Sequence, residues 1–221
     1  MAGQQQEIKS LGGDKYDWIY GDMHMPIVAD GREHSTKFGG TYSVKQEAPD
    51  KWVMTRMHHG HVTAVHTWTL SDGGQQWNIK TKGTHPDGSS FTENETKTRV
   101  GAGSGFAGTW ESKHDQLSSF PNWVIGTYGQ NGLSFRTPAD QEYQNVKFDG
   151  KEYPDHGPRV PPGATSSAKR IDEHTIQVTD DLKGKVLDTQ ELKVSGDGKT
   201  LTDTEHVSGE QTPQIIVFEK M

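Results

Sequence analysis

Arginine, histidine and tryptophan alternate with other residues between positions 52 and 79, which gives this segment the richest chemistry in the chain. Side chains alternate between the two faces of a β-strand, so Trp52, Met54 and Arg56 would share one face. His66 and Trp68 would likewise share a face of the next strand. A guanidinium and an imidazole among aromatic rings suit an anionic or carbonyl group, and the imidazole could transfer a proton near neutral pH. The alternative is that these polar groups are exposed, or hydrogen-bonded for structural reasons, on a two-sided sheet.

A second group of rings near the N-terminus would cap one mouth of a barrel or serve ordinary packing; it comprises Tyr16, Trp18, Tyr20 and His24. The candidate ligand-binding residues are therefore Trp18, Tyr20, Trp52, Met54, Arg56, His66, Trp68 and Trp77. If the protein is an enzyme, Arg56 would hold a developing anion, and His66 or His24 would act as acid or base.

The run His58-His59-Gly60-His61 raises the question of a metal site, because imidazoles bind zinc, copper and nickel. Such a site needs three or more converging ligands, whereas His58 and His59 would point to opposite faces of a strand. Glu93 and Glu95 could complete a set, but no spacing requires it. We expect a solvated, histidine-rich hairpin and predict neither a metal nor another cofactor.

Composition narrows the classes of function. The absence of cysteine excludes disulfides, thiolate ligands and thiol nucleophiles. The net charge of −7, without a basic stripe, predicts no nucleic-acid partner. We expect no membrane span, because no apolar run approaches the roughly 20 residues needed, and no signal peptide at the N-terminus. Nucleophile-elbow, zinc-protease, Walker and dinucleotide-binding motifs are also missing. The oligomeric state is left open.

The same composition favours an all-β fold with thin cores. Only 29% of residues are hydrophobic, whereas glycine (26) and proline (10) are plentiful. Six Trp, six Tyr and seven Phe supply large buried area per residue. An antiparallel barrel fits this balance, because each strand needs one apolar face and its many turns consume glycine.

An internal repeat is the strongest pattern in the sequence. Residues 42–82 align without a gap on residues 166–206, and both blocks predict a β-meander whose turn glycines coincide. Arg56 falls on Asp180 in this alignment, and His66 falls on Gln190, so both positions stay polar. This pattern fits two related units of which one has a specialised pocket, and drift on a solvent-exposed face would look the same.

Four segments resemble a family of lipocalin-like bacterial proteins: residues 106–112 with their Gly-Thr-Trp sequence, 146–154, 169–172 and 196–201. The resemblance implies a β-barrel that opens with the Gly-Thr-Trp strand. It also implies export to the periplasm or beyond, and a family of mostly unassigned function. It is close over residues 105–220 and looser over 24–99, and it supports the fold far more than an activity.

The resemblance predicts a first repeat at residues 1–100, a glycine-rich linker at 101–105 and a second repeat at 106–221. An ordinary hairpin at 101–105 is the alternative. The first half has no Gly-Thr-Trp strand before its aromatic group, so the two repeats either form tandem barrels or fuse into one larger closed sheet.

Three functions follow from this fold. The first is binding of a small, partly apolar molecule in a pocket lined by aromatic residues. The second is a cofactor-independent isomerase, lyase or hydrolase that uses the same pocket. The third is an extracellular structural or interaction module whose barrels have solid cores.

Overall fold

β-Branched and aromatic residues recur along most of the chain, and these segments form antiparallel strands. The computed structural model describes residues 4–117 and 122–221, within which one short 3₁₀ turn at Asp72–Gly74 is the single helical element. The predicted all-β fold is confirmed. Two compact units divide the chain between residues 120 and 121, and each contains one sheet of its own.

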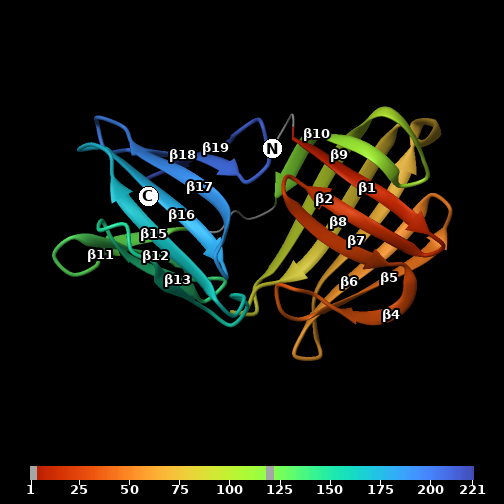
Figure 1. Cartoon of the computed structure of the whole chain (residues 1–221), viewed down its shortest axis with the longest axis horizontal. Coiled ribbons are helices and arrows are strands. Elements are labelled where there is room, and N and C mark those ends of the chain that lie inside the picture. The colour runs from red at the N-terminus through yellow and green to blue at the C-terminus, as the bar shows by residue number, and fades with distance from the viewer. Residues whose placement is uncertain (1–3, 118–121) are drawn as a thin grey trace. The chain divides into compact units, whose positions relative to one another are not determined.

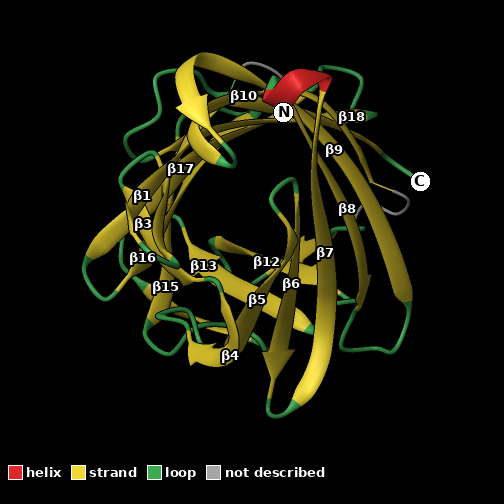
Figure 2. Cartoon of the chain, turned by 90° about the vertical axis from the view of Figure 1, so that its right-hand side faces the viewer, coloured by secondary structure: helices red, strands yellow, loops and turns green. Residues whose placement is uncertain are grey.

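The first unit contains a ten-stranded sheet in the order β3-β2-β1-β10-β9-β8-β7-β6-β5-β4, so strands that follow one another along the chain are neighbours almost throughout (Figures 1 and 2). Its strands are β1 (Gln5–Gly12), β2 (Lys15–Tyr20), β3 (Met23–Val28), β4 (Asp30–Ser35), β5 (Thr41–Ala48), β6 (Lys51–His58), β7 (His61–Ser71), β8 (Gln76–Thr84), β9 (Ser90–Ser104) and β10 (Ala107–Leu117).

Pairing between the first and last strands closes this sheet into a barrel. β1 runs antiparallel to β10, with Ile8 opposite Gly108. The remaining seam lies between β3 and β4, which have no ladder in common. There the hydroxyl of Tyr42 on β5 donates a hydrogen bond to the carbonyl of Pro26 (2.9 Å) and accepts one from the amide of Val28 (3.1 Å). A single side chain thus takes the place of a backbone ladder.

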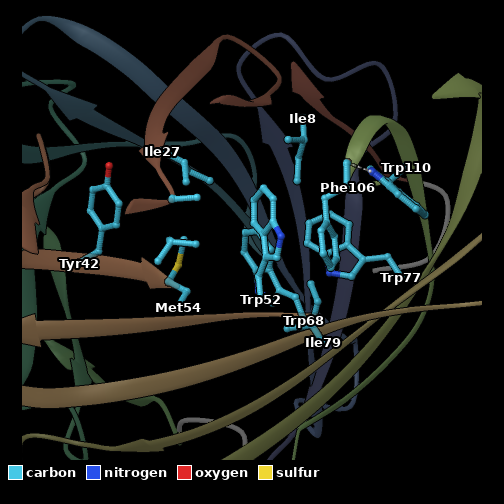
Figure 3. Close-up of a cluster of buried hydrophobic side chains, with 12 residues drawn as sticks. Ile8, Ile27, Tyr42, Trp52, Met54, Trp68, Trp77, Ile79, Phe106 and Trp110 are labelled. Carbon is cyan, nitrogen blue, oxygen red and sulfur yellow. Dashed lines mark hydrogen bonds between the residues drawn. The ribbon is translucent and has the colours of Figure 1, made fainter. Parts of the chain in front are cut away.

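Large aromatic side chains fill one part of the barrel interior. We call this cluster the aromatic plug (Figure 3); it comprises Trp52, Trp68, Trp77, Phe106 and Trp110, each at most 3% exposed. The ring centroids of Trp68 and Trp77 are 4.9 Å apart, and those of Trp77 and Trp110 are 5.5 Å apart. Edge and tilted contacts of this kind add to the large apolar area that the rings bury.

Arg99 explains why the division expected at residues 101–105 is wrong. Its guanidinium lies 4.1 Å from the ring centroid of Trp110 and donates hydrogen bonds to the carbonyls of Gly74 and Ala107. A Cβ at Gly103 would lie 2.2 Å from Nη1 of Arg99 and 2.5 Å from the carbonyl oxygen of Ala107. Because the second contact is with backbone, glycine is required for this close approach. The glycine-rich run belongs to the β9–β10 hairpin, and the Gly-Thr-Trp strand completes the first sheet instead of opening the second.

The second unit contains a nine-stranded sheet in simple chain order. Its strands are β11 (Val124–Thr127), β12 (Gly132–Thr137), β13 (Glu142–Lys147), β14 (Tyr153–His156), β15 (Ala164–Arg170), β16 (Thr175–Leu182), β17 (Lys185–Val194), β18 (Thr200–Val207) and β19 (Gln214–Glu219). The ring of Trp123, just before β11, stacks on Phe218 of β19 with centroids 4.9 Å apart, so the two ends of the sheet approach one another. The two units therefore contain separate sheets in tandem, not one fused barrel.

The aligned blocks have the same strand pairing in both units. β5 to β8 cover residues 42–82 and β15 to β18 cover 166–206. Met54 is opposite His66 in the first sheet, and at the aligned positions Val178 is opposite Gln190 in the second. Equal register means that aligned residues occupy equivalent places on the inner faces.

Replacing Tyr42 with phenylalanine should loosen the seam. The Tyr42→Phe variant leaves the Pro26 carbonyl and the Val28 amide without their partner, which costs about 1–3 kcal/mol of unfolding free energy. Hydrogen exchange should show faster exchange of the Val28 amide than in the wild type. Tyr143→Phe, at a side chain that is 40% exposed, is the control. Unchanged protection of Val28 would contradict the proposed role of the hydroxyl.

Candidate functional site

Beside the aromatic plug the first barrel encloses a hollow of about 690 Å³, within the range typical of small-molecule sites. Its lining residues come from β2 to β9 and from the β4–β5 hairpin. They are Trp18, His24, Met25, Pro26, Ile27, His34, Ser35, Thr36, Lys37, Phe38, Tyr42, Met54, Arg56, His66, Trp68, Ile79, Thr81, Glu93 and Glu95.

Apolar side chains make one wall of the hollow. The rings of Trp18 and Trp68 meet edge to face at 5.3 Å, and Trp68 is also part of the plug. Met54 and Ile79 extend this wall, with Tyr42 further along the barrel (Figure 3). The wall offers flat aromatic surface together with the adaptable thioether of methionine, a combination that suits an apolar or aromatic group.

The polar side of the hollow is centred on His66. Its Nδ1 is 2.9 Å from the hydroxyl of Thr81, the residue directly opposite on β8. Burial, and secondarily the positive charge of Arg56, lowers the pKa of His66 to about 4. The ring is therefore neutral at pH 7.

The hydrogen bonding of His66 indicates which nitrogen carries the proton. Nε2 is buried and has no hydrogen-bond partner among the described residues. If the Thr81 hydroxyl donates to Nδ1, its proton is used and Nε2 carries the ring proton. The other tautomer would leave two groups unsatisfied, the Thr81 proton and the Nε2 lone pair. The first arrangement is less costly and makes Nε2 an unsatisfied N–H donor on a residue that lines the hollow.

A buried ion pair between Lys97 and Glu95 borders this polar side. Lys97 is fully buried, pairs with Glu95 and lies 3.1 Å from the Ser112 hydroxyl, which in turn contacts the same carboxylate at 2.9 Å. The ammonium also lies 5.6 Å from the ring centroid of Trp77. The pair links the polar side of the hollow to the plug and fixes the Glu95 carboxylate in the wall.

Exposed histidine–aspartate pairs lie at the rim. His24 is 2.6 Å from Asp17, and His34 is 2.8 Å from Asp30. The His24 side chain is 59% exposed, so the hollow reaches solvent on this side. His24 is thus placed at the mouth of the hollow, on a different strand from the imidazole of His66.

The structure divides the sequence-based candidates into two sets. Those that line the hollow are Trp18, His24, Met54, Arg56, His66 and Trp68. Those absent from its lining are Tyr20, Trp52 and Trp77; the last two belong to the plug. Sequence reasoning did not include Thr81 or Tyr42 in the site, and it considered Glu93 and Glu95 only as metal ligands. The spacing of Glu93, Glu95, Lys97 and Arg99 at every second residue was the available signal for a shared inner face.

The histidine-rich hairpin lies at the β6–β7 turn, with His58 opposite His61 and the rings of His58 and His59 4.2 Å apart. These residues do not line the hollow. Over residues 4–117 and 122–221, no group of three or more His, Asp or Glu side chains is placed to hold a metal ion.

Comparison with known proteins returned no match among family models, curated sequences or solved structures. Within the described part of the chain, no helix has the length and apolarity needed to cross a bilayer. The chemistry of the hollow therefore has to be inferred from its own residues.

Removing the buried ammonium should strongly destabilise the first unit. In Lys97→Met the Glu95 carboxylate loses its counter-ion, and breaking such a pair costs about 3–5 kcal/mol. Urea unfolding followed by tryptophan fluorescence reports mainly on this unit, which contains five of the six tryptophans. Adding Glu95→Gln to Lys97→Met should recover part of the loss. A double variant as unstable as the single one would contradict this role of the pair.

Proposed function

We propose that the first unit binds a small, partly apolar molecule that presents a hydrogen-bond acceptor, such as a carbonyl or a carboxylate, to His66. The observation that carries this proposal is the buried, unpartnered Nε2 of His66 in the wall of an aromatic-lined hollow. A ligand acceptor would satisfy this group, whose desolvation otherwise costs free energy.

The electrostatics favour the same class of ligand. Arg56 lines the hollow and is close enough to His66 to lower its pKa. A positive guanidinium and a neutral N–H donor on one side would orient an anionic or carbonyl group, while the Trp18–Trp68 wall accommodates the apolar part. Small-molecule sites are usually built in this way, with mainly apolar linings and a few polar groups that set the orientation of the ligand.

Binding explains this site better than acid–base catalysis. An imidazole with a pKa of about 4 is a weak base at neutral pH, because general bases work best with a pKa near the operating pH. We also retain the lipocalin-like family, with its exported location, as part of the proposal; the motifs that support it are those of the sequence.

A matched pair of probes tests the function. 1-Anilinonaphthalene-8-sulfonate and N-phenyl-1-naphthylamine have the same ring system, but the first also carries a sulfonate that supplies the acceptor. We expect both to gain fluorescence in the hollow, and the sulfonate to bind more tightly. Met54→Trp should weaken both, because the larger ring occupies the hollow. No saturable binding of either probe would contradict the proposal.

His66→Phe separates the polar contact from the apolar one. The variant keeps a ring of similar shape but removes the N–H donor. The sulfonate probe should therefore lose about ten- to a hundredfold in affinity, since one hydrogen bond to a charged group contributes about 1.5–3 kcal/mol. The neutral probe should change little. His61→Phe, at an exposed hairpin position, is the control. Equal losses of affinity for both probes would show that His66 does not donate a hydrogen bond to the acceptor of the ligand.

A further inference from the structure

The inner face of the second sheet carries a band of carboxyl groups. We call it the acidic band; it comprises Asp155, Asp180, Asp188, Asp203 and Glu205. Asp180 on β16 is directly opposite Asp188 on β17. On β18, Asp203 is opposite the buried Leu192, so it faces inward, and Glu205 two residues later shares that face.

The band occupies the place that the polar side of the hollow has in the first unit. In the alignment of residues 42–82 on 166–206, Arg56 corresponds to Asp180 and Thr81 to Glu205. Because the strand pairing is also equivalent, the inner-face position that is cationic in the first unit is acidic in the second. This reversal points to a ligand of the opposite charge.

A serine hydroxyl links two carboxyl groups of the band. The Ser166 hydroxyl is 2.7 Å from Oδ1 of Asp155 and 2.7 Å from Oδ1 of Asp180. A hydroxyl has one proton to donate, so one of the two carboxyls must itself be protonated to make the other contact. Gln190 extends the network to Asp188, with its Nε2 3.3 Å from a carboxylate oxygen of Asp180 and of Asp188.

Three carboxyl groups of the band have pKa values near neutral pH. Burial, and secondarily the charge of neighbouring carboxylates, raises the pKa of Asp188 and of Asp203 to about 7. Asp155 reaches a pKa of about 6, chiefly by burial. The band therefore holds protons at pH 7 that a bound cation can displace.

Asp203 supplies an independent sign of a missing partner. It is 3% exposed, and its Oδ1 is buried without a hydrogen-bond donor in the described part of the chain. A buried carboxylate oxygen that lacks a donor is costly, and an N–H group would satisfy it. Asp188 and Glu205 are only partly buried, so the band is reachable from solvent.

The spacing of the band favours an organic cation over a metal ion. The described residues contain no group of three or more carboxylates or imidazoles placed to hold a metal. Several ammonium groups on one flexible chain can reach carboxyls on different strands. The apolar cluster on the same face, which includes Val178 and Leu192, suits methylene groups. We propose that the acidic band binds an aliphatic polyamine, with one ammonium on Asp203 and another on Asp188.

Calorimetric titration of the full chain with spermidine tests this inference. Because a cation favours the ionised carboxyls, binding at pH 7 should release protons, which appear as a dependence of the measured heat on the ionisation enthalpy of the buffer. Affinity should rise between pH 6 and pH 8. Butylamine and Mg²⁺ at matched ionic strength should bind at least tenfold more weakly.

Variants locate the site. Asp203→Asn and Asp188→Asn should each weaken spermidine binding by about tenfold, the usual effect of losing one charge-assisted contact. Glu191→Gln removes the same charge from an exposed position on β17, whose side chain points to the opposite face, and should leave binding unchanged. Circular dichroism checks the fold, and if Asp203→Asn does not fold, Asp188→Asn decides. Absence of saturable heat, an equal response to Mg²⁺, or an equal loss in Glu191→Gln would overturn the proposal.

Discussion

Closure of the first sheet is the constraint on which the other features depend. Once β1 pairs with β10 and Tyr42 bridges the seam, every second side chain of ten strands must point into one enclosed space. Five aromatic rings occupy part of that space and belong to the buried apolar cluster of the unit. The part beyond the plug stays open, and this open part is the hollow that Trp18, Arg56 and His66 help to line. The pocket is thus a consequence of uneven filling along one set of strands.

Alternation was readable from the sequence, and it correctly grouped Trp52, Met54 and Arg56 on one face, as it did His66 and Trp68. The meander could also be located, because turn glycines and β-branched residues recur in both aligned blocks. What could not be read was which rings fill the barrel and which line a space. Trp52 and Trp68 are opposite each other on one face, yet only Trp68 reaches the hollow. The two rings differ in their neighbours from β2: the ring of Tyr16 lies 4.8 Å from that of Trp52, whereas the ring of Trp18 lies 5.3 Å from that of Trp68.

The glycine-rich run at 101–105 was predicted to be a linker between two repeats, and there is a physical reason why it is not. Glycine is expected in flexible connections, but it is equally required where a large side chain approaches the backbone. Here a Cβ at Gly103 would meet both the guanidinium of Arg99 and the carbonyl of Ala107, and β9 continues through Gly103. A long-range contact of this kind leaves no local pattern in the sequence. Lys97 is a similar case, because its burial depends on an ion pair with Glu95. In the sequence such a lysine looks the same as an exposed one.

Ligand binding requires an accessible hollow beside the plug of the first barrel. Methyl-labelled methionine offers the most direct test, because Met54 and Met25 line the hollow whereas Met57 lies on the outer face of the same strand as Met54. With the naphthylamine probe added, we expect intermolecular nuclear Overhauser effects to the methyl groups of Met54 and Met25 and none to Met57. Contacts confined to Met57 and the exposed Met221, or no contact with any methionine, would contradict this expectation.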